Sequence, residues 1–565
     1  MIRSTAFPLK PRTAAAAAPR FRALRTGAAS SGALVFLSAA LLCAQTPDIS
    51  GDRIRAHVKF LSSDLLEGRG PGSRGGELAA AYIATEFALF GLKPAGDNGT
   101  YFQMVPLVGV TTEPEATVEA QGGGKQLQFR WLDDFVGATA QQKPDARIDG
   151  DVIFVGHGIV APEFHWDDFK GVDVRGKILV LFTNEPPSDD PKFFGGKALT
   201  YYGRWTYKYE EATRRGAQAV FIIHTTPTAG YSYAVVRSSW GREDGQVRVQ
   251  PGQNALGFAG WLSQDAGNKL LALAGHNVDE MLRLAESRDF HPMPLGIHIR
   301  GDFPTRLRDI RSSNVVGIVE GSDPVLKKQA VVYTAHWDHL GVGTPVNGDA
   351  IYNGAVDNGT GCGIILETAQ DWAALPDKPK RSAIFLAVTG EEEGLLGSAY
   401  YAAHPFIPVG RTALDLNYDA LFPAGRVRDV SAAGGERTTV WPVVEEVARR
   451  MNLTIKPDAH PEQGSYYRSD HFSFANAGVP AFSIDEGTDF VGKPADFGEK
   501  LFEDYNEHHY HQPSDEFHED WDFSGLAQMV RFGMEVGIAV ANESRLPTWR
   551  AGDEFLPARE KSGVK

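Results

Sequence analysis

Cysteine is almost absent from this chain of 565 residues, which contains only Cys43 and Cys362. If residues 1–44 are removed, as their pattern predicts below, Cys362 stands alone, and a single cysteine cannot form an internal disulfide. Cys362 lies in G-T-G-C-G-I-I-L at a predicted helix start, where we expect a small packed side chain rather than a nucleophile. The fold must therefore rest on its packed core and on what the folded chain binds.

An excess of positive charge is also missing. The 56 Lys and Arg residues face 71 Asp and Glu residues, and the net charge is −15. Residues 1–44 contain six basic and no acidic side chains, which leaves about −21 on the rest. This balance argues against nucleic acid or an anionic membrane as partner and fits simple solubility. A length of 565 residues predicts two domains or one domain with a large insertion.

The apolar stretch Ala33–Leu42 is too short for a comfortable transmembrane helix, and a basic, alanine-rich region precedes it. Residues 1–44 are therefore interpreted as a signal peptide, with cleavage near Ala44. The alternatives are an uncleaved anchor and a lipoprotein on Cys43, but Leu42 occupies the place where a lipidation signal has a small residue. We expect a secreted or periplasmic protein without stable membrane insertion after signal removal.

Three motifs dominate the stretch from Thr334 to Ser398, namely T-A-H-W-D-H-L-G, G-A-V-D-N-G-T-G and T-G-E-E-E-G-L-L-G-S. The apolar runs Val331–Thr334 and Ala383–Val388 lead into the first and third motifs and are typical of buried parallel strands. Ligands of open α/β sheets bind beyond the carboxyl ends of the strands. The pattern therefore predicts a site at that edge.

The residue types in these motifs suit metal ions. His336 offers an imidazole nitrogen while Asp357 and Glu392 offer oxygens, a mixture that suits zinc and tolerates manganese or cobalt. The two oxygens of Asp357 can bridge cations roughly 3.5–4 Å apart. Asp338 is placed to hold the other nitrogen of His336, and one of Glu391 and Glu392 is free to take a proton from water. The alternative is that these are solvated acids at loop ends. It would require three such clusters to lie at predicted strand ends or helix starts by chance.

Two further motifs follow, L-N-Y-D-A-L-F with Asp419 and Y-H-Q-P-S-D-E with His511. The ordered set H-x-D, V-D-N-G, E-E-x-G-L-x-G-S, N-x-D and Y-H-x-P-x-D resembles the di-zinc metallopeptidase family of bacterial leucyl aminopeptidase, aminopeptidase Y and glutamate carboxypeptidase. The resemblance covers roughly residues 311–542. His508 and His509 compete with His511, but only His511 lies in the motif, and Asp515 is placed to orient it.

The resemblance implies two Zn2+ ions, with Mn2+ or Co2+ as possible substitutes. His336 and Asp419 would bind one ion, Glu392 and His511 the other, and Asp357 would bridge them. Glu391 would be the general base, because the G-L-L-G-S register makes Glu393 the variable residue of the family pattern.

The resemblance also implies an α/β fold, a three-layer α/β/α zinc-peptidase sheet of the phosphorylase/hydrolase-like type. We expect residues 48–144 to be an N-terminal segment of the peptidase domain, 304–545 the catalytic domain and 546–565 a loose tail. Residues 145–303, with V-R-G-K-I-L-V-L and G-A-Q-A-V-F-I-I, resemble an inserted β-rich protease-associated domain. A lid or substrate-selecting role and a mere spacer both remain open for it.

The predicted function is that of an exported zinc aminopeptidase acting on peptides. A carboxypeptidase of the glutamate carboxypeptidase type is the alternative, and Arg468 would suit its terminal carboxylate. A non-catalytic binding protein on the same fold and a glutaminyl cyclase are the others, and the full ligand set argues against them. Tyr467, Arg468 and His471, with Tyr466, are candidates for substrate contact or oxyanion stabilisation, and equally for structural contacts. The oligomeric state is not predicted.

Overall fold

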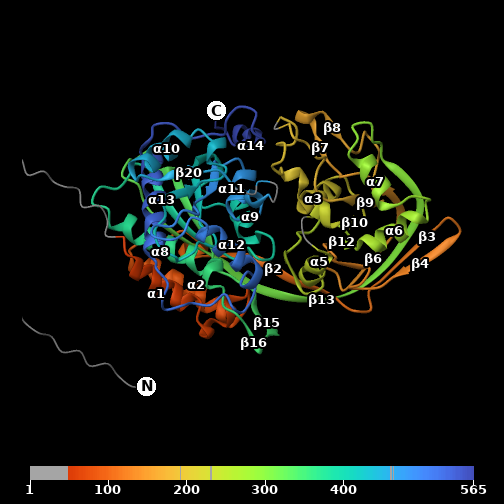
Figure 1. Ribbon diagram of the computed structural model, residues 1–565, viewed down its shortest axis with the longest axis horizontal. Coiled ribbons are helices and arrows are strands. Elements are labelled where there is room, and N and C mark those ends of the chain that lie inside the picture. Colours follow the sequence, from red (N-terminus) through yellow and green to blue (C-terminus); the bar gives the residue numbers. More distant parts are fainter. Residues whose placement is uncertain (1–48, 191, 230–231, 459–460, 462–463, 565) are drawn as a thin grey trace, which may run out of the picture. The chain divides into compact units, whose positions relative to one another are not determined.

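The apolar runs form parallel strands of one sheet in the computed structural model, which describes residues 49–564 apart from 191, 230–231, 459–460 and 462–463 (Figure 1). The strands lie in the order β21, β18, β14, β17, with bounds Ala481–Ser483, Thr412–Asn417, Ala330–His336 and Ser382–Val388. Every residue of these four strands is buried, as expected for parallel strands covered on both faces.

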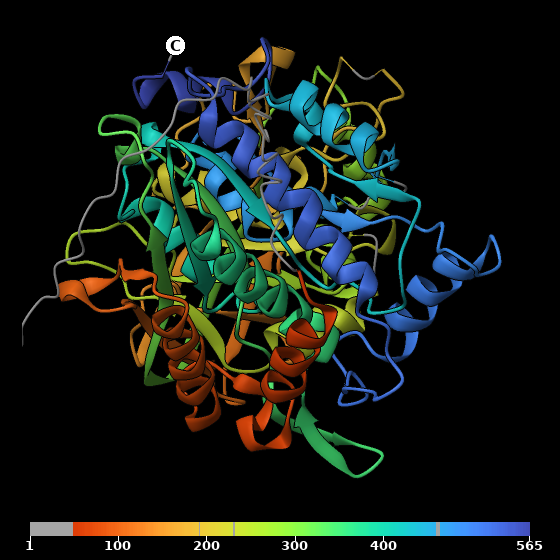
Figure 2. The same cartoon turned by 90° about the vertical axis from the view of Figure 1, so that its left-hand side faces the viewer.

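Helices cover both faces of this sheet, so the predicted three-layer α/β/α architecture is confirmed. Val331 and Tyr333 of β14 pack into one core cluster with four helices, namely α1 (Gly51–Leu61), α2 (Arg74–Leu89), α8 (Gly361–Ala374) and α13 (Ser524–Asn542). Val332 points to the opposite face, where α9 (Leu396–Ala403) and α11 (His471–Asn476) contribute. Figure 2 shows α13 lying across the first face.

A second sheet continues from the first through one strand of 27 residues, β13 (Met293–Val319). Its residues Val315–Val319 pair antiparallel with β17, whereas its earlier residues pair antiparallel with β6. The second sheet runs β6, β9, β10, β12, β5, with bounds Asp145–Phe154, Ile178–Phe182, Ala219–Ile223, Phe258–Leu262 and Phe135–Ala138. We call the part of the chain built on this sheet, residues 117–303, the inserted module.

The inserted module begins earlier than the predicted boundary at residue 145. Strands β3 (Thr117–Gly122) and β4 (Lys125–Phe129) form a hairpin, and β3 pairs with His298–Asp302 of β13. The module is also less purely β than predicted, because helices pack on both faces of its sheet. These are α6 (Gln264–Ala272) and α7 (Val278–Ala285) on one face and α3 (Trp205–Arg214) and α5 (Tyr233–Trp240) on the other.

The prediction of a loose tail over residues 546–565 is wrong for the described part. Trp549 is 1% exposed and its indole N–H donates to the Gly478 carbonyl at 3.0 Å. Arg559, in α14 (Leu556–Lys561), is fully buried and donates to the carbonyls of Pro547 and Val409. The segment therefore closes the core beside α11.

The predicted signal peptide, residues 1–44 with Cys43, lies outside the described residues. In the part of the chain that the structure does describe, no helix has both the length and the apolar character needed to span a bilayer.

Candidate metal centre

The candidate ligands gather at the carboxyl edge of the parallel strands, as predicted. His336 is the last residue of β14, Glu391 and Glu392 follow the end of β17, and Asp419 follows the end of β18. Parallel strands end at the same edge of a sheet, which brings these side chains together. Asp357 comes from the helical turn Ala355–Thr360 that leads into α8, and its peptide bond to Asn358 is cis.

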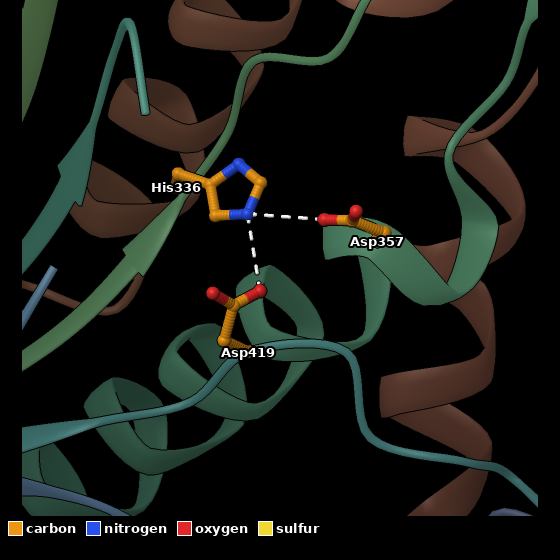
Figure 3. Close-up of side chains that lie close together, drawn as sticks. All are labelled: His336, Asp357 and Asp419. Carbon is orange, nitrogen blue, oxygen red and sulfur yellow. Dashed lines mark hydrogen bonds and ion pairs between the residues drawn. The ribbon is translucent and has the colours of Figure 1, made fainter. Parts of the chain in front are cut away.

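Three of these side chains form a first donor group (Figure 3). The Nε2 atom of His336 lies 3.2 Å from Oδ1 of Asp357 and 3.1 Å from Oδ1 of Asp419. His336 is 1% exposed, and its Nδ1 lies 3.1 Å from the backbone carbonyl oxygen of Asp338. The imidazole is thus oriented with Nε2 toward the carboxylates.

A second donor group is built on the other oxygen of Asp357. The Nε2 atom of His511 lies 3.3 Å from Oδ2 of Asp357 and 3.0 Å from Oε2 of Glu392. His508 and His509, the competing histidines, form other contacts: the Nδ1 atoms lie near the carbonyls of Asp504 and Ser514. Asp357 therefore faces both groups with one oxygen each.

Each group meets the geometric and electrostatic demands of a zinc ion. Ligand atoms at 2.0–2.1 Å from a tetrahedral ion stand about 3.3 Å apart, close to the separations found here. Burial alone would lower the pKa of His511, but Glu392 and Asp357 raise it to about 10. For His336 burial is likewise outweighed, by Asp419, Glu391 and Asp357, and its pKa lies well above the usual value. The carboxylates thus favour positive charge at two adjacent points.

Glu391 stands beside these groups without being needed by either. Oxygen atoms of Glu391 and Glu392 and a nitrogen of His336 lie within 4.8 Å of one another. Burial raises the pKa of Glu391 well above its usual value, although the His336 charge opposes this, and Asp419 and Glu392 raise it further. A carboxyl group in this environment readily holds a proton.

Two predicted orienting contacts are wrong in detail. The Asp338 carboxylate lies 3.9 Å from Nδ1 of His336, too far for a hydrogen bond, and this nitrogen contacts the Asp338 backbone carbonyl instead. The Asp338 carboxylate accepts the Glu391 N–H at 3.3 Å. Asp515 does not orient His511; its oxygens accept the N–H groups of Val356 at 2.9 Å and Asp357 at 3.0 Å. Both acids therefore fix the backbone that carries the donors.

The sequence reasoning missed His339. Its side chain is fully buried, and Nδ1 lies 2.6 Å from Oε1 of Glu392. His339, Asp357 and Glu392 also form a cluster of potential ligand atoms. The second histidine of T-A-H-W-D-H was the available signal. Cys362 is packed as predicted: its Sγ donates to the His336 carbonyl, and burial raises its pKa to about 12.

The predicted substrate contacts divide into buried and exposed residues. Tyr467 is 6% exposed and donates its hydroxyl to Glu554, and His471 is 2% exposed, so neither side chain is open to solvent. Arg468 is exposed, and its charge acts on Tyr510, whose ring stacks on His511 with centroids 3.9 Å apart. Of the three, only Arg468 has an exposed side chain.

Residues 314–532 match a known family, described as Peptidase family M28. The chain is similar to Aminopeptidase YwaD of Bacillus subtilis (29% identity over 174 residues, 30% of this chain and 34% of the relative). It is also similar to Leupeptin-inactivating enzyme 1 of Streptomyces exfoliatus (26% over 198 residues, 34% and 40%). The matches thus span well under half of these relatives. The solved aminopeptidase from Aneurinibacillus sp. strain AM-1 superposes with a TM-score of 0.48 at 18% identity, covering 89% of this chain and 97% of that one.

Proposed function

Because residues 314–532 belong to peptidase family M28, we propose that the protein is a zinc-dependent aminopeptidase that uses two zinc ions to release N-terminal residues from peptides. The observation that carries the proposal is the pair of donor groups that share Asp357. The relatives named aminopeptidases support the reaction class.

The donor groups suggest how the ions would be held. His336 and Asp419 would bind one ion, Glu392 and His511 the other, and Asp357 both. When bound, zinc supplies a Lewis acid that polarises the scissile carbonyl and makes water more acidic. Nitrogen and oxygen donors of this kind also accept manganese or cobalt.

Glu391 is the proposed general base. Its side chain lies within the donor cluster, yet neither donor group requires it. It would take a proton from the attacking water and return it to the leaving amine, a role that suits a carboxyl group with a raised pKa. Asp338 supports it as a positioning residue, since its carboxylate accepts the Glu391 N–H.

Charge around the donor groups favours an N-terminal amine over a C-terminal carboxylate. Burial raises the pKa of Asp470 to about 7, and neighbouring Asp419 adds to this. Burial and the Asp419 charge likewise raise the pKa of Asp485 to about 7. A substrate ammonium group near these carboxyl groups would favour their ionised form and pair with it, whereas a terminal carboxylate would not. Arg468 is the residue that favours the carboxypeptidase alternative.

Two further parts of the proposal rest on sequence patterns. The basic and apolar pattern of residues 1–44 supports export, and V-R-G-K-I-L-V-L supports a protease-associated identity for the inserted module.

The test replaces two adjacent acids. Glu391→Gln should lower kcat on leucyl peptides about 10³-fold while the protein keeps two zinc ions per chain, because the base is lost and the ligands are not. Glu393→Gln is the matched control, since the Glu393 side chain points at Gly245 instead of the donors. The measurements are kcat and zinc content. If Glu393→Gln is the inactive variant, the assignment of the base is wrong.

Substrate ends and metal stoichiometry separate the alternatives. An aminopeptidase cleaves C-blocked dipeptides and spares N-blocked ones, and a carboxypeptidase does the reverse. A single zinc ion per chain would point to a cyclase, and none to a binding protein.

A further inference from the structure

A cavity of about 380 Å³ lies in the inserted module, away from the donor groups. Its apolar floor includes Ala138 and Ala259, whose small side chains leave the space open. Tyr209 and Trp240 form an aromatic wall with ring centroids 5.7 Å apart, and the Tyr209 hydroxyl is anchored on the Gly260 carbonyl at 3.1 Å. The cavity therefore has a fixed aromatic face.

The rim of the cavity carries more negative than positive charge. Glu210, Arg214 and Asp244 line it. Arg214 is held by Glu210 at 3.5 Å and by Glu211 at 2.8 Å, so its charge is balanced by these acids. Asp244 accepts a hydrogen bond from the neutral Gln246 amide at 2.7 Å. Asp244 and Trp240 both line the cavity; burial raises the pKa of Asp244 to about 6, against the opposing effects of Gln246 and the Arg242 charge, so its carboxyl group is mostly ionised at neutral pH.

Strand β11 (Asp244–Val247) connects this cavity to the metal centre. Side chains alternate along a strand, and Asp244 and Gln246 both face the cavity. On the opposite face, a Cβ at Gly245 would lie 2.5 Å from Cγ of Glu393, and Val247 packs against the cluster of Val105, Leu107 and Ile310. Glu393 directly follows Glu392 of the second donor group, so strand β11 stands between the cavity and the donor groups.

We propose that this cavity is a subsite for a lysine or arginine side chain of the peptide substrate, bound between Trp240 and Asp244. An aromatic face and a carboxylate together recognise a cation that also has an apolar stem. A peptide that runs around this strand needs at least about three residues of extended chain to span ~10 Å, which places the basic residue three or more positions from the cleaved bond. This inference rests on the proposed peptidase function and adds the substrate class.

The first experiment measures kcat/KM of the zinc-loaded protein on four tetrapeptides. These are Arg-Ala-Ala-Ala, Leu-Arg-Ala-Ala, Leu-Ala-Arg-Ala and Leu-Ala-Ala-Arg, each compared with its citrulline counterpart, which is neutral and nearly the same shape. At one position at least, arginine should be favoured about tenfold. Asp244→Asn should reduce that preference to near unity, and Trp240→Leu should weaken it.

Glu243→Gln is the matched control. Glu243 precedes Asp244 but pairs with Arg308 at 2.7 Å and does not line the cavity. The variant should keep the arginine preference. If the peptides are cleaved but arginine and citrulline differ by less than twofold everywhere, or if Asp244→Asn keeps the preference, the subsite is refuted while the peptidase function stands.

A second measurement decides the matter if no peptide is cleaved. Nα-acetyl-arginine amide and Nα-acetyl-citrulline amide are titrated into the full chain, with binding followed by calorimetry. The arginine derivative should bind about tenfold more tightly, and the difference should vanish in Asp244→Asn. Equal Kd values would overturn the subsite, whatever the catalytic result.

Discussion

The sheet of parallel strands β21, β18, β14 and β17 and the inserted module both bury charged side chains, but in opposite ways. In the module, the Lys208 ammonium is 1% exposed and donates to the carbonyls of Asn184 at 2.9 Å and Tyr202 at 2.6 Å. Asp168 accepts the Trp166 indole N–H at 2.8 Å and a backbone N–H at 2.9 Å. These charges are satisfied by groups of the chain itself.

At the candidate metal centre, like charges converge instead. The carboxylates of Asp357, Glu392 and Asp419 are directed at two imidazole nitrogens, and Glu391 adds a fourth carboxyl group. Such an arrangement is costly for the chain alone, because each carboxylate raises the energy of the next. The comparison teaches that buried charge by itself does not identify a site. Several carboxylates that converge without backbone hydrogen-bond partners do identify a candidate site.

The largest effect is expected for Asp357→Ala, which tests whether the converging carboxylates hold metal ions. Because Asp357 faces both donor groups, its loss should remove both zinc ions and reduce kcat/KM at least about 10⁴-fold, beyond the effect of a lost base alone. Zinc content after gel filtration and peptide hydrolysis check this. Asp520→Ala, which changes an exposed acid, should keep both. A variant that retains two ions would show that Asp357 does not bridge them.

Lys208→Met tests whether the buried charges of the inserted module serve stability and not metal binding. The change leaves two buried carbonyls without their donor and Asp168 without a nearby cation, so the free energy of unfolding should fall by about 3 kcal/mol. Zinc content should not change. Lys197→Met, in the same module but 80% exposed, should cost less than about 0.5 kcal/mol. Denaturant unfolding measures both, and a zinc loss in Lys208→Met would contradict the separation of the two regions.

Several candidate donors could be predicted from sequence because they follow a recognisable local signal, whereas His511 was assigned through the family resemblance. His336 and Asp419 come directly after apolar runs, and Glu391 and Glu392 come after another. The strands and the three layers followed from the same runs. Burial on both faces makes such strands uniformly apolar, which is a signal that a single sequence carries.

Long-range pairing could not be predicted in the same way. The start of the module depends on β3 pairing with β13, about 180 residues later, and no local pattern encodes that register. The C-terminal segment has a polar composition, yet single contacts of Trp549 and Arg559 fix it. Asp338 was assigned the wrong contact because its carbonyl and its carboxylate are both within reach of one imidazole.

In contrast to the charged groups, buried neutral histidines should affect the pH dependence of stability in the same way in the two regions. Burial lowers the pKa of His471, near the centre, to about 3, and that of His157, in the module, to about 3. The unfolded chain, with a histidine pKa near 6.5, binds the proton first as pH falls. Stability is therefore lost between about pH 6.5 and pH 3, and His471 contributes about 2 kcal/mol of the loss between pH 7 and pH 5.

His471→Gln and His157→Gln should each reduce the fall in unfolding free energy between pH 7 and pH 5 by that amount. His291→Gln, at an exposed histidine, should leave the pH dependence unchanged. Denaturant unfolding at the two pH values gives the differences. An unaltered slope in His471→Gln would mean that this histidine is already protonated in the folded protein.

The smallest effect is expected at Arg468, and it decides which end of the peptide the centre holds. Arg468 is exposed and no donor group uses it, so for an aminopeptidase Arg468→Ala should change kcat/KM on leucyl peptides less than about threefold. Arg428→Ala, another exposed arginine, paired with Asp489, is the control. A carboxypeptidase would instead lose about 100-fold through KM, because a buried carboxylate without its cation costs several kcal/mol. A small effect here would leave the N-terminal amine as the end of the peptide that the centre recognises.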